Sequence, residues 1–497
     1  MTILVVIYFL CAFLLMIYGI NSHILAQLFK RTFPERMLKD GRFLLSFYKA
    51  KPPFNPSSEP CRRLPVVTTQ LPVFNELNVV ERLIDAVAAF QYPEGRHEIQ
   101  VLDDSTDETR KIVSRKIREL RRRGVDIHHI TRHNRKGFKA GALREGLALA
   151  RGDFVAIFDA DFVPSSDFLL RAMPFFVDYR ALGFIQARWG HLNENESWLT
   201  RLQAIGINGH FMVEQGARSA DGLFMNFNGT AGVFRKEAII DAGNWQDDTL
   251  TEDMDLSYRM QLRGWQCRYL IDLVAPAEIP RDLNAFKNQQ FRWAKGSTQT
   301  AIKLMPRIWR SPASFFAKFQ AFMHMTHYVI HPLMLTLALL APLLLMQEVR
   351  FLTGLNLLCF GVLLAVSCTG PSRMYLVAEK ALGRRYSQTL LMLPFMVCFG
   401  CGLAINNTRA VLEALLGRSS GFVRTPKCGA EERKRYRIAK SPLICIEIFI
   451  GLWCFLGMSL YFFSHHYLIG HFMLIYGLGF LCIGGFSWWH AKGKSIP

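Results

Sequence analysis

Two carboxylates stand one residue apart directly after a short apolar run near the middle of the first half of the chain. Residues 154–158 read Phe-Val-Ala-Ile-Phe, which is typical of a buried strand, and Asp159 and Asp161 follow. Because side chains alternate along a strand, we expect Asp159 and Asp161 to point the same way. Acids at this end of a strand lie where open α/β sheets bind ligands. Two hard oxygen ligands suit Mg²⁺ or Mn²⁺ carrying a diphosphate, although the pair alone would equally fit a solvated loop.

Other charged residues stand at the ends of neighbouring predicted elements. Asp103 and Asp104 follow a strand at residues 99–102, where an acid can bind a nucleobase or ribose, or cap the next helix. Lys139 precedes a helix at residues 140–150, so its ammonium and the free N–H groups there form an anion site. Neither a Walker A sequence nor Gly-x-Gly-x-x-Gly occurs, which argues against ATPase and dinucleotide-binding classes.

Two strings further along the chain add candidate ligands. Phe227, Asn228 and Gly229 belong to a glycine-containing turn, where a backbone can approach a ligand closely. Glu252 and Asp253 follow Thr251 at the start of an amphipathic helix, where acids are also favoured for structural reasons alone.

A third string carries a guanidinium and an indole. Gln289, Arg292 and Trp293 share one helical face by their three- and four-residue spacing. Arg suits a diphosphate and Trp suits the face of a sugar, although a helix packed on a membrane surface would show the same pattern.

The elements that carry these residues alternate between strand and helix. The pattern predicts strands at residues 64–71, 99–102, 127–131 and 154–158, separated by helices. Such alternation predicts an α/β domain with a mostly parallel sheet and helices on both faces. We place this soluble domain at residues 65–310.

Long apolar runs flank the soluble domain in this chain of 497 residues, 51% of which are hydrophobic. Residues 1–29 form a predicted N-terminal transmembrane helix, and the basic residues after it place the soluble domain in the cytoplasm. A juxtamembrane helix and linker follow at 30–64. Beyond the domain we predict an interfacial helix at 311–325 and a membrane region at 326–497. Its expected spans lie at about 326–346, 351–371, 442–463 and 467–489.

Charge decides which C-terminal runs cross the membrane. Residues 409–440 are rich in Arg and Lys, and the positive-inside bias keeps such a segment in the cytoplasm. The preceding run, broken by Pro394, is therefore predicted to form a re-entrant or interfacial helix at 388–417, followed by a cytoplasmic loop at 418–440. Glu447 lies near the end of a predicted span, where it could snorkel or serve a function.

The remaining composition excludes other classes. The net charge is +19, but the basic residues cluster beside apolar runs, which favours anionic lipid headgroups over nucleic acid. The eleven cysteines show neither metal-ligand spacing nor a disulfide framework, which indicates reduced thiols.

Taken in order, these strings resemble the signature of the family-2 inverting glycosyltransferases, in particular the cellulose-synthase-like synthases of β-linked polysaccharides. That signature, written D, DxD, TED, QxxRW, reads here Asp104, Asp159-Ala-Asp161, Thr251-Glu-Asp253 and Gln289-x-x-Arg-Trp293. Strings at residues 100–107, 134–143, 186–189 and 227–232 are most similar to the glucomannan and xyloglucan-backbone synthase subfamilies and their bacterial relatives. The resemblance implies a single GT-A-type, Rossmann-like glycosyltransferase domain inserted between transmembrane helices.

The resemblance also implies a role for each residue and a divalent cofactor, Mg²⁺ or Mn²⁺. The implied roles are the catalytic base for Asp253; nucleotide-sugar binding for Asp103, Asp104, Lys139, Asp159, Gln289 and Arg292; metal binding for Asp161 and Asp159; and acceptor binding for Phe227, Asn228, Gly229, Glu252 and Trp293.

Residues 422–427 resemble the gating loop of cellulose synthases, usually written FxVTxK. The matching positions are Phe422, Arg424, Thr425 and Lys427. Arg424 stands where that pattern has Val, so its contacts are left open.

These observations predict a membrane-embedded inverting hexosyltransferase that polymerises hexose from UDP-glucose or GDP-mannose into a β-linked polysaccharide and exports it. Its expected partners are the nucleotide sugar, the growing chain and the lipid bilayer, whether in a bacterial inner membrane or in a Golgi or plasma membrane; an export partner is not identified. One alternative is a non-processive lipid glycosyltransferase that makes a β-linked glycolipid, which product size would distinguish. The second is a non-catalytic polysaccharide transporter or receptor, which would release no nucleoside diphosphate.

Overall fold

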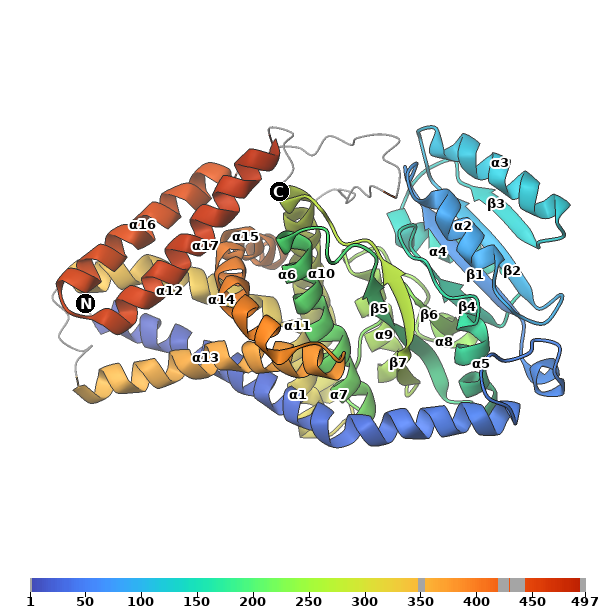
Figure 1. Cartoon of the computed structure of the whole chain (residues 1–497), viewed down its shortest axis with the longest axis horizontal. Helices are drawn as coiled ribbons and strands as arrows, with labels where there is room; N and C mark the ends of the chain where they lie inside the picture. Colours follow the sequence, from blue (N-terminus) through green and yellow to red (C-terminus); the bar gives the residue numbers. More distant parts are fainter. Residues whose placement is uncertain (1, 347–353, 419–428, 430–442, 492–497) are drawn as a thin grey trace.

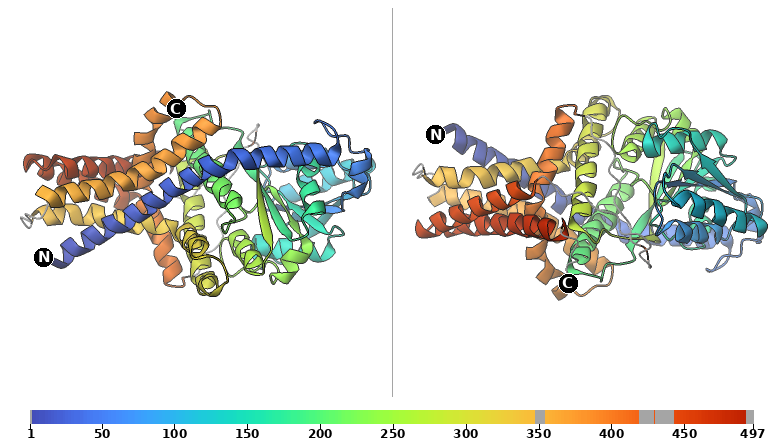
Figure 2. Two further views of the ribbon diagram at one scale, coloured as in Figure 1. Left: turned by 90° about the horizontal axis from the view of Figure 1, so that it is seen from below. Right: turned by 90° about the horizontal axis from the view of Figure 1, so that it is seen from above.

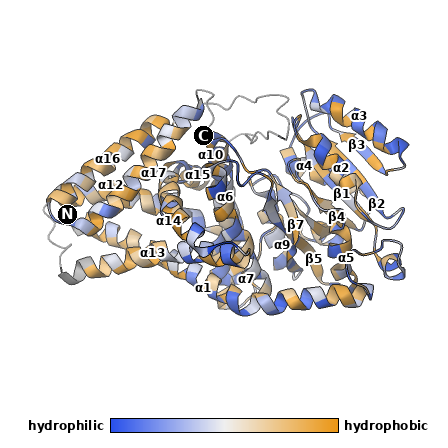
Figure 3. Cartoon of the chain, in the orientation of Figure 1, coloured by the Kyte–Doolittle hydropathy of each residue, from blue (hydrophilic) through white to orange (hydrophobic). Residues whose placement is uncertain are grey.

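A computed structural model describes residues 2–346, 354–418, 429 and 443–491, and places a mixed α/β domain beside a bundle of long apolar helices (Figures 1 and 2). The predicted gating-loop residues Phe422, Arg424, Thr425 and Lys427 lie outside the described residues. Figure 3 shows that apolar residues dominate the helices of the bundle, whereas the α/β domain mixes both kinds.

Seven strands form one sheet in the order β3-β2-β1-β4-β6-β5-β7. β6 runs antiparallel to both of its neighbours, and the other strand pairs are parallel. The strands are β1 (Val67–Val73), β2 (His97–Asp103), β3 (Ile127–Thr131), β4 (Phe154–Ile157), β5 (Leu182–His191), β6 (Gly232–Arg235) and β7 (Gln266–Ala277).

Helices cover both faces of the sheet. Alternate residues of β4 enter different cores: Ala156 packs in one and Val155 in the other. Both faces of a central strand are therefore buried, as in α/β proteins generally. The predicted fold class, a mostly parallel sheet between two helical layers, is confirmed. The helices of this domain are α2 (Val80–Ala88), α3 (Thr109–Arg122), α4 (Phe138–Leu149), α5 (Phe168–Asp178), α6 (Trp198–Asn208), α7 (Gln215–Ala220), α8 (Lys236–Asp241) and α9 (Glu252–Leu262), with a 3-10 turn η1 (Glu59–Arg63) and a π-helix η2 (Gly209–Glu214).

The N-terminal helix α1 (Thr2–Tyr48) continues without a break through residue 29, the end of the predicted span, and through much of the predicted juxtamembrane segment. Two contacts to the α/β domain account for the extra turns. Phe43 stacks on Phe175 of α5, with ring centroids 4.6 Å apart. Asp40 accepts a hydrogen bond from Arg268 of β7 at 2.5 Å. Tertiary packing thus extends a helix that the hydropathy pattern alone would end earlier.

Among the residues that the structure describes, five helices are long and apolar enough to cross a membrane: residues 3–48, 327–345, 358–381, 444–463 and 467–490. The predicted re-entrant segment forms two helices, α14 (Tyr386–Gly402) and α15 (Ala404–Leu415), with a bend of 43° between them. This geometry fits either a broken span or a re-entrant loop, so the predicted topology stays a prediction. The other helices here are α12 (Ile330–Met346), preceded by the 3-10 turn η3 (His327–Val329), then α13 (Gly354–Ala381), α16 (Ile444–Phe463) and α17 (Tyr467–Ala491).

Helix α10 (Leu283–Arg310) stands between the sheet and the apolar bundle (Figure 1). The Asp282 carboxylate caps the N-terminus of this helix by accepting hydrogen bonds from the backbone N–H groups of Asn284 and Ala285. The predicted interfacial helix follows as α11 (Phe315–Met325), in which Phe315 is 74% exposed. Exposed aromatic side chains of this kind suit the boundary between membrane and water.

Candidate active site

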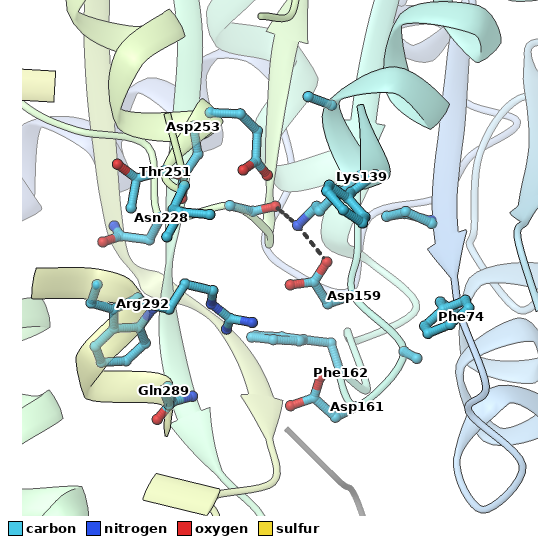
Figure 4. A pocket seen from close by; sticks show the side chains of 18 of the residues that line it. Phe74, Lys139, Asp159, Asp161, Phe162, Asn228, Thr251, Asp253, Gln289 and Arg292 are labelled. Atoms are coloured by element: carbon cyan, nitrogen blue, oxygen red, sulfur yellow. Dashed lines mark hydrogen bonds and ion pairs between the residues drawn. The ribbon is translucent and has the colours of Figure 1, made fainter. Parts of the chain in front are cut away.

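A cavity of about 390 Å³ opens at the carboxyl ends of β1 and β4 and extends to α10 (Figure 4). Residues from all parts of the signature line it. They are Asp104, Asp159, Asp161, Thr251, Glu252, Asp253, Gln289, Arg292 and Trp293, and they are joined by Lys139, Asn228 and Gly229 from other predicted binding positions. Segments nearly 190 residues apart in sequence therefore meet around one space, which chance placement of the motifs would not produce.

The two acids of the Asp-x-Asp pair lie in a turn and not on the strand, because β4 ends at Ile157. Both side chains line the cavity, as expected, but strand alternation is not the reason, because neither residue belongs to the strand. Asp159 accepts a 2.6 Å hydrogen bond from Lys139, which also donates to the Gly229 carbonyl at 2.7 Å (Figure 4).

Lys139 keeps its charge in this surrounding. Burial alone lowers the pKa of its ammonium, but the carboxylates of Asp159 and Glu252 outweigh burial and raise it. A permanent cation beside Asp159 suits a site that receives an anionic group.

Asp253 lies in the first turn of α9 and faces the same cavity. Burial and then the adjacent Glu252 carboxylate raise the pKa of Asp253 to about 7, while Lys139 acts in the opposite direction. Burial likewise raises the pKa of Glu252. An acid that titrates near neutral pH is matched to general base catalysis at that pH.

A glycine is required beside Asp253. Gly229 has φ of +80°, and a Cβ atom built on it would lie 2.9 Å from Asp253 Oδ2 and 3.5 Å from Lys139 Nζ. The turn can therefore approach the two charged groups only without a side chain.

α10 brings Gln289, Arg292 and Trp293 to the cavity from the side of the apolar bundle. Burial lowers the pKa of Arg292, and the carboxylates of Glu252 and Asp159 act against that shift. The helix packs closely on Thr251, because a Cβ on Gly296 would lie 2.8 Å from the Thr251 backbone nitrogen. Gln299 adds a hydrogen bond from the Leu250 N–H, at 3.0 Å. α10 and the segment carrying Asp253 are thus fixed to one another.

The opposite end of the cavity, near β1 and β2, contains Asp104. Arg132 donates to both of its carboxylate oxygens, at 2.9 and 2.5 Å. Close by, the Arg135 guanidinium lies 3.3 Å from the centroid of the Phe74 ring. This end therefore presents the planar guanidinium of Arg135 beside the Asp104 carboxylate, whose negative charge is already balanced by Arg132.

Two of the predicted ligands need correction. Asp103 is buried and does not line the cavity; its carboxylate accepts hydrogen bonds from the Ser105 N–H at 2.8 Å and His129 at 2.9 Å. Burial alone would raise the pKa of Asp103, but those two hydrogen bonds outweigh it and lower the pKa. Asp103 thus shapes the turn behind the site, and Asp104 alone of the pair faces it.

The second correction concerns the turn at Gly229. Phe227 is fully buried and packs in the core against Phe234, with ring centroids 4.5 Å apart, so it cannot contact an acceptor. Asn228 does line the cavity, but its Oδ1 faces His210 at 3.0 Å and its N–H donates to Gln186 at 2.9 Å.

The cavity also contains residues that no sequence prediction assigned to it. Among them are Phe74, Arg135, Trp189, His191 and Glu278. Arg135 and Trp189 belong to strings that the family resemblance had already marked, at residues 134–143 and 186–189, and that resemblance could have identified them. Glu278 belongs to no motif; it pairs with Arg82 at 2.8 Å and accepts the Gly429 N–H at 3.2 Å.

A divalent ion fits Asp159 and Asp161. Carboxylates outnumber basic groups among the residues that line the cavity, so an anionic diphosphate needs added positive charge there. Among the described residues, no group of three or more His, Cys, Asp or Glu side chains could hold a metal ion by itself. Two carboxylates with oxygens from a substrate diphosphate match the usual coordination of Mg²⁺.

Comparison with known proteins agrees with this geometry. Residues 65–296 match the model of the family described as Glycosyltransferase like family 2. A glucomannan 4-beta-mannosyltransferase from Arabidopsis thaliana is 34% identical over 400 residues, which cover 77% of this chain and 71% of the relative. A probable glucomannan 4-beta-mannosyltransferase from Oryza sativa subsp. japonica is also 34% identical, over 84% of this chain and 73% of the relative.

Among solved structures, a mannosyltransferase from Pyrobaculum calidifontis in complex with GDP-Man and Mn²⁺ is similar at a TM-score of 0.48 and 19% identity, covering 82% of this chain and all of that one. A likeness at this level establishes no shared activity. The curated relatives are decisive because each is matched over most of its own length. The chain belongs to the family-2 glycosyltransferases, with a GT-A-type domain beside apolar helices, and it is a hexosyltransferase of the cellulose-synthase-like group.

Proposed function

We propose that this chain transfers mannose from GDP-mannose, or glucose from UDP-glucose, to the end of a growing β-linked polysaccharide, with inversion at the anomeric carbon. One observation carries the proposal: Asp253, with a pKa raised to about 7, faces the same cavity as Asp159, Asp161, Arg292 and Trp293. The names of the relatives favour mannose as the sugar.

Asp253 acts as the general base. Its carboxylate removes the proton from an acceptor hydroxyl as that oxygen attacks the donor sugar from the face opposite the leaving group. One base is sufficient for a single displacement, so an α-linked donor gives a β-linked product. Gly229 permits the close approach of the turn to Asp253.

Positive charge within the same cavity stabilises the leaving nucleoside diphosphate. Arg292 and Lys139 supply fixed positive charge, and Asp104, Arg135 and Phe74 lie where the nucleoside would bind. Asp161 and Asp159 would hold Mg²⁺ or Mn²⁺, which supplies Lewis-acid stabilisation of the diphosphate when bound. The resemblance assigns Gln289 to the same substrate.

The acceptor enters from the side of α10. Trp293 lines the cavity and also packs against a cluster formed by Ala294, Tyr328, Ala410 and Val411, which belong to α10, η3 and α15. A sugar stacked on Trp293 would therefore lie next to the apolar bundle. We place the α/β domain in the cytoplasm and the exit path of the polysaccharide between the membrane helices.

The test uses the full chain reconstituted in lipid vesicles. We expect nucleoside diphosphate release from GDP-mannose, less from UDP-glucose, and a ladder or insoluble product that β-1,4-mannanase degrades. Chelation should abolish release, and added Mg²⁺ or Mn²⁺ should restore it. A single glycolipid product would favour the non-processive alternative. If neither donor releases nucleoside diphosphate, the chain is not the proposed transferase.

A further inference from the structure

His191 ends β5 and lines the catalytic cavity, although no part of the signature includes it. One of its ring nitrogens, Nε2, lies 2.9 Å from the side-chain oxygen of Asn208, at the end of α6. Asn208 in turn contacts Glu379 of α13, a helix of the apolar bundle. A chain of two hydrogen bonds, from His191 through Asn208 to Glu379, therefore joins the cavity to the apolar bundle.

The direction of these hydrogen bonds follows from Glu379. Its carboxylate is fully buried and pairs with Arg201 at 3.1 Å and Arg384 at 2.9 Å; because guanidinium groups can only donate, its oxygens act as acceptors. The contact at 2.7 Å must then come from the Asn208 amide nitrogen. This fixes the amide, and its oxygen faces His191. The Nε2 of His191 must therefore carry the proton and donate.

The other nitrogen of the ring is left as an acceptor. Burial lowers the pKa of His191; Asn208 and Glu194 act against that shift, and Arg384 and Arg188 add to it. The ring is thus neutral near neutral pH, and with a proton on Nε2 it has a lone pair on Nδ1. Within the described part of the chain, Nδ1 has no hydrogen-bond partner.

The sheet order indicates which substrate this lone pair meets. Asp104 and Phe74 lie at the ends of β2 and β1, the Asp-x-Asp pair follows β4, and β6 separates β4 from β5. His191 therefore lies on the far side of the metal-binding acids from the nucleoside end. Through Asn208 it is joined to α13 of the apolar bundle, between whose helices the product is proposed to leave, so a sugar of the acceptor is the group we expect it to meet.

We propose that Nδ1 of His191 accepts a hydrogen bond from a hydroxyl of the acceptor polysaccharide, and that Asn208 and Glu379 are positioning residues that fix the ring in the required tautomer. The inference rests on the proposed function and adds to it a residue that recognises the acceptor. The ligand it implies is a neutral sugar hydroxyl, since a donor group is required opposite the lone pair.

Two substitutions separate the two ring nitrogens. His191→Gln keeps a donor near Nε2 for Asn208 but removes the acceptor at Nδ1, whereas His191→Asn places an amide oxygen near Nδ1. We expect H191Q to raise the KM for β-1,4-mannotetraose about tenfold, as for loss of one hydrogen bond in a desolvated site. H191N should stay within about threefold of wild type. The donor KM should change in neither variant, and Asn208→Leu should give an intermediate rise.

Several results would overturn the inference. An unchanged acceptor KM in H191Q would remove the contact, and an equal loss in both variants, or a lower melting temperature that accounts for the loss, would make His191 a structural residue. Direct binding of mannotetraose is measured in parallel, where the same tenfold difference is expected. If the wild type transfers no sugar yet binds mannotetraose with this dependence on His191, the proposed function fails and the inference stands.

Discussion

The two sides of α10 present charged residues to very different surroundings. Toward the bundle, Lys287 lies 2.5 Å from Glu447 of α16, and their side chains are only 2% and 0% exposed. Lys295, two turns later, lies 2.9 Å from Glu413 of α15. Toward the cavity, Arg292 faces several carboxylates, among them Glu252 and Asp159.

This difference in surroundings distinguishes charged residues that stabilise the fold from charged residues that take part in a reaction. On the bundle side each lysine has a carboxylate at ion-pair distance, so the charges balance within the protein. On the cavity side carboxylates exceed cations, and the pKa of Asp253 is displaced to about 7. Displaced pKa values and unbalanced charge are typical of catalytic sites. Removing a charge should therefore affect activity on one side and stability on the other.

The largest expected effect is that of Asp253→Asn. We expect kcat to fall by roughly 10²–10⁴-fold, the usual contribution of general base catalysis, with nucleotide affinity and melting temperature preserved. Transfer assays and calorimetric titration with the nucleoside diphosphate provide the measurements. Asp248→Asn is the matched control, because Asp248 lines the same cavity but has a 57% exposed side chain paired with Lys303. Near wild-type transfer by D253N would remove the assigned base.

Lys287→Met tests the bundle side. Losing one partner of a buried pair leaves Glu447 uncompensated, which we expect to cost roughly 3–5 kcal/mol in the free energy of unfolding. The double variant Lys287→Met/Glu447→Leu should regain most of that loss. Thermal unfolding in detergent would measure both. Equal melting temperatures for wild type and the single variant would show that the ion pair does not stabilise the contact between α10 and α16.

Local pattern was sufficient to predict much of this fold and site. Strand β3 was predicted at its observed bounds, and the predicted site residues Asp104, Lys139, Asp253 and Arg292 all line the cavity. Asp104, Lys139 and Asp253 stand at the end of a strand or the start of a helix, where topology determines which edge of the sheet they share. Arg292 lies within α10, and the spacing of its motif identified it.

What the sequence could not provide depends on contacts between distant segments. Only the fold shows that Asp103 turns away to His129 while Asp104 faces the cavity. Glu447 could snorkel or serve a function by its position in the sequence, but it is buried against Lys287, 160 residues away. His191 and Glu379 carry no motif, and their connection exists only because β5, α6 and α13 meet.

The pH dependence of transfer would sharpen the assignment on the cavity side. Asp253 must be deprotonated to act as a base, and its raised pKa of about 7 means that it is protonated below that pH. At saturating donor we therefore expect kcat to fall about tenfold per pH unit below pH 7 and to level off above it. Glu252→Gln removes the neighbouring carboxylate, so the pKa of Asp253 should drop and the acid limb should move to lower pH. A rate that is constant down to pH 5 would contradict this assignment.

Lys295→Met should have the smallest effect, although Lys295 is as buried as Lys287. Its partner Glu413 has a side chain that is 15% exposed and also accepts a hydrogen bond from Arg409 at 2.8 Å. The carboxylate thus keeps one cation and some water, so we expect a loss of about 1 kcal/mol. Thermal unfolding of the two lysine variants side by side measures the difference. If the loss were as large as that of Lys287→Met, burial of the lysine would determine the energy of these pairs. The partners that remain for the unpaired carboxylate would then have little effect.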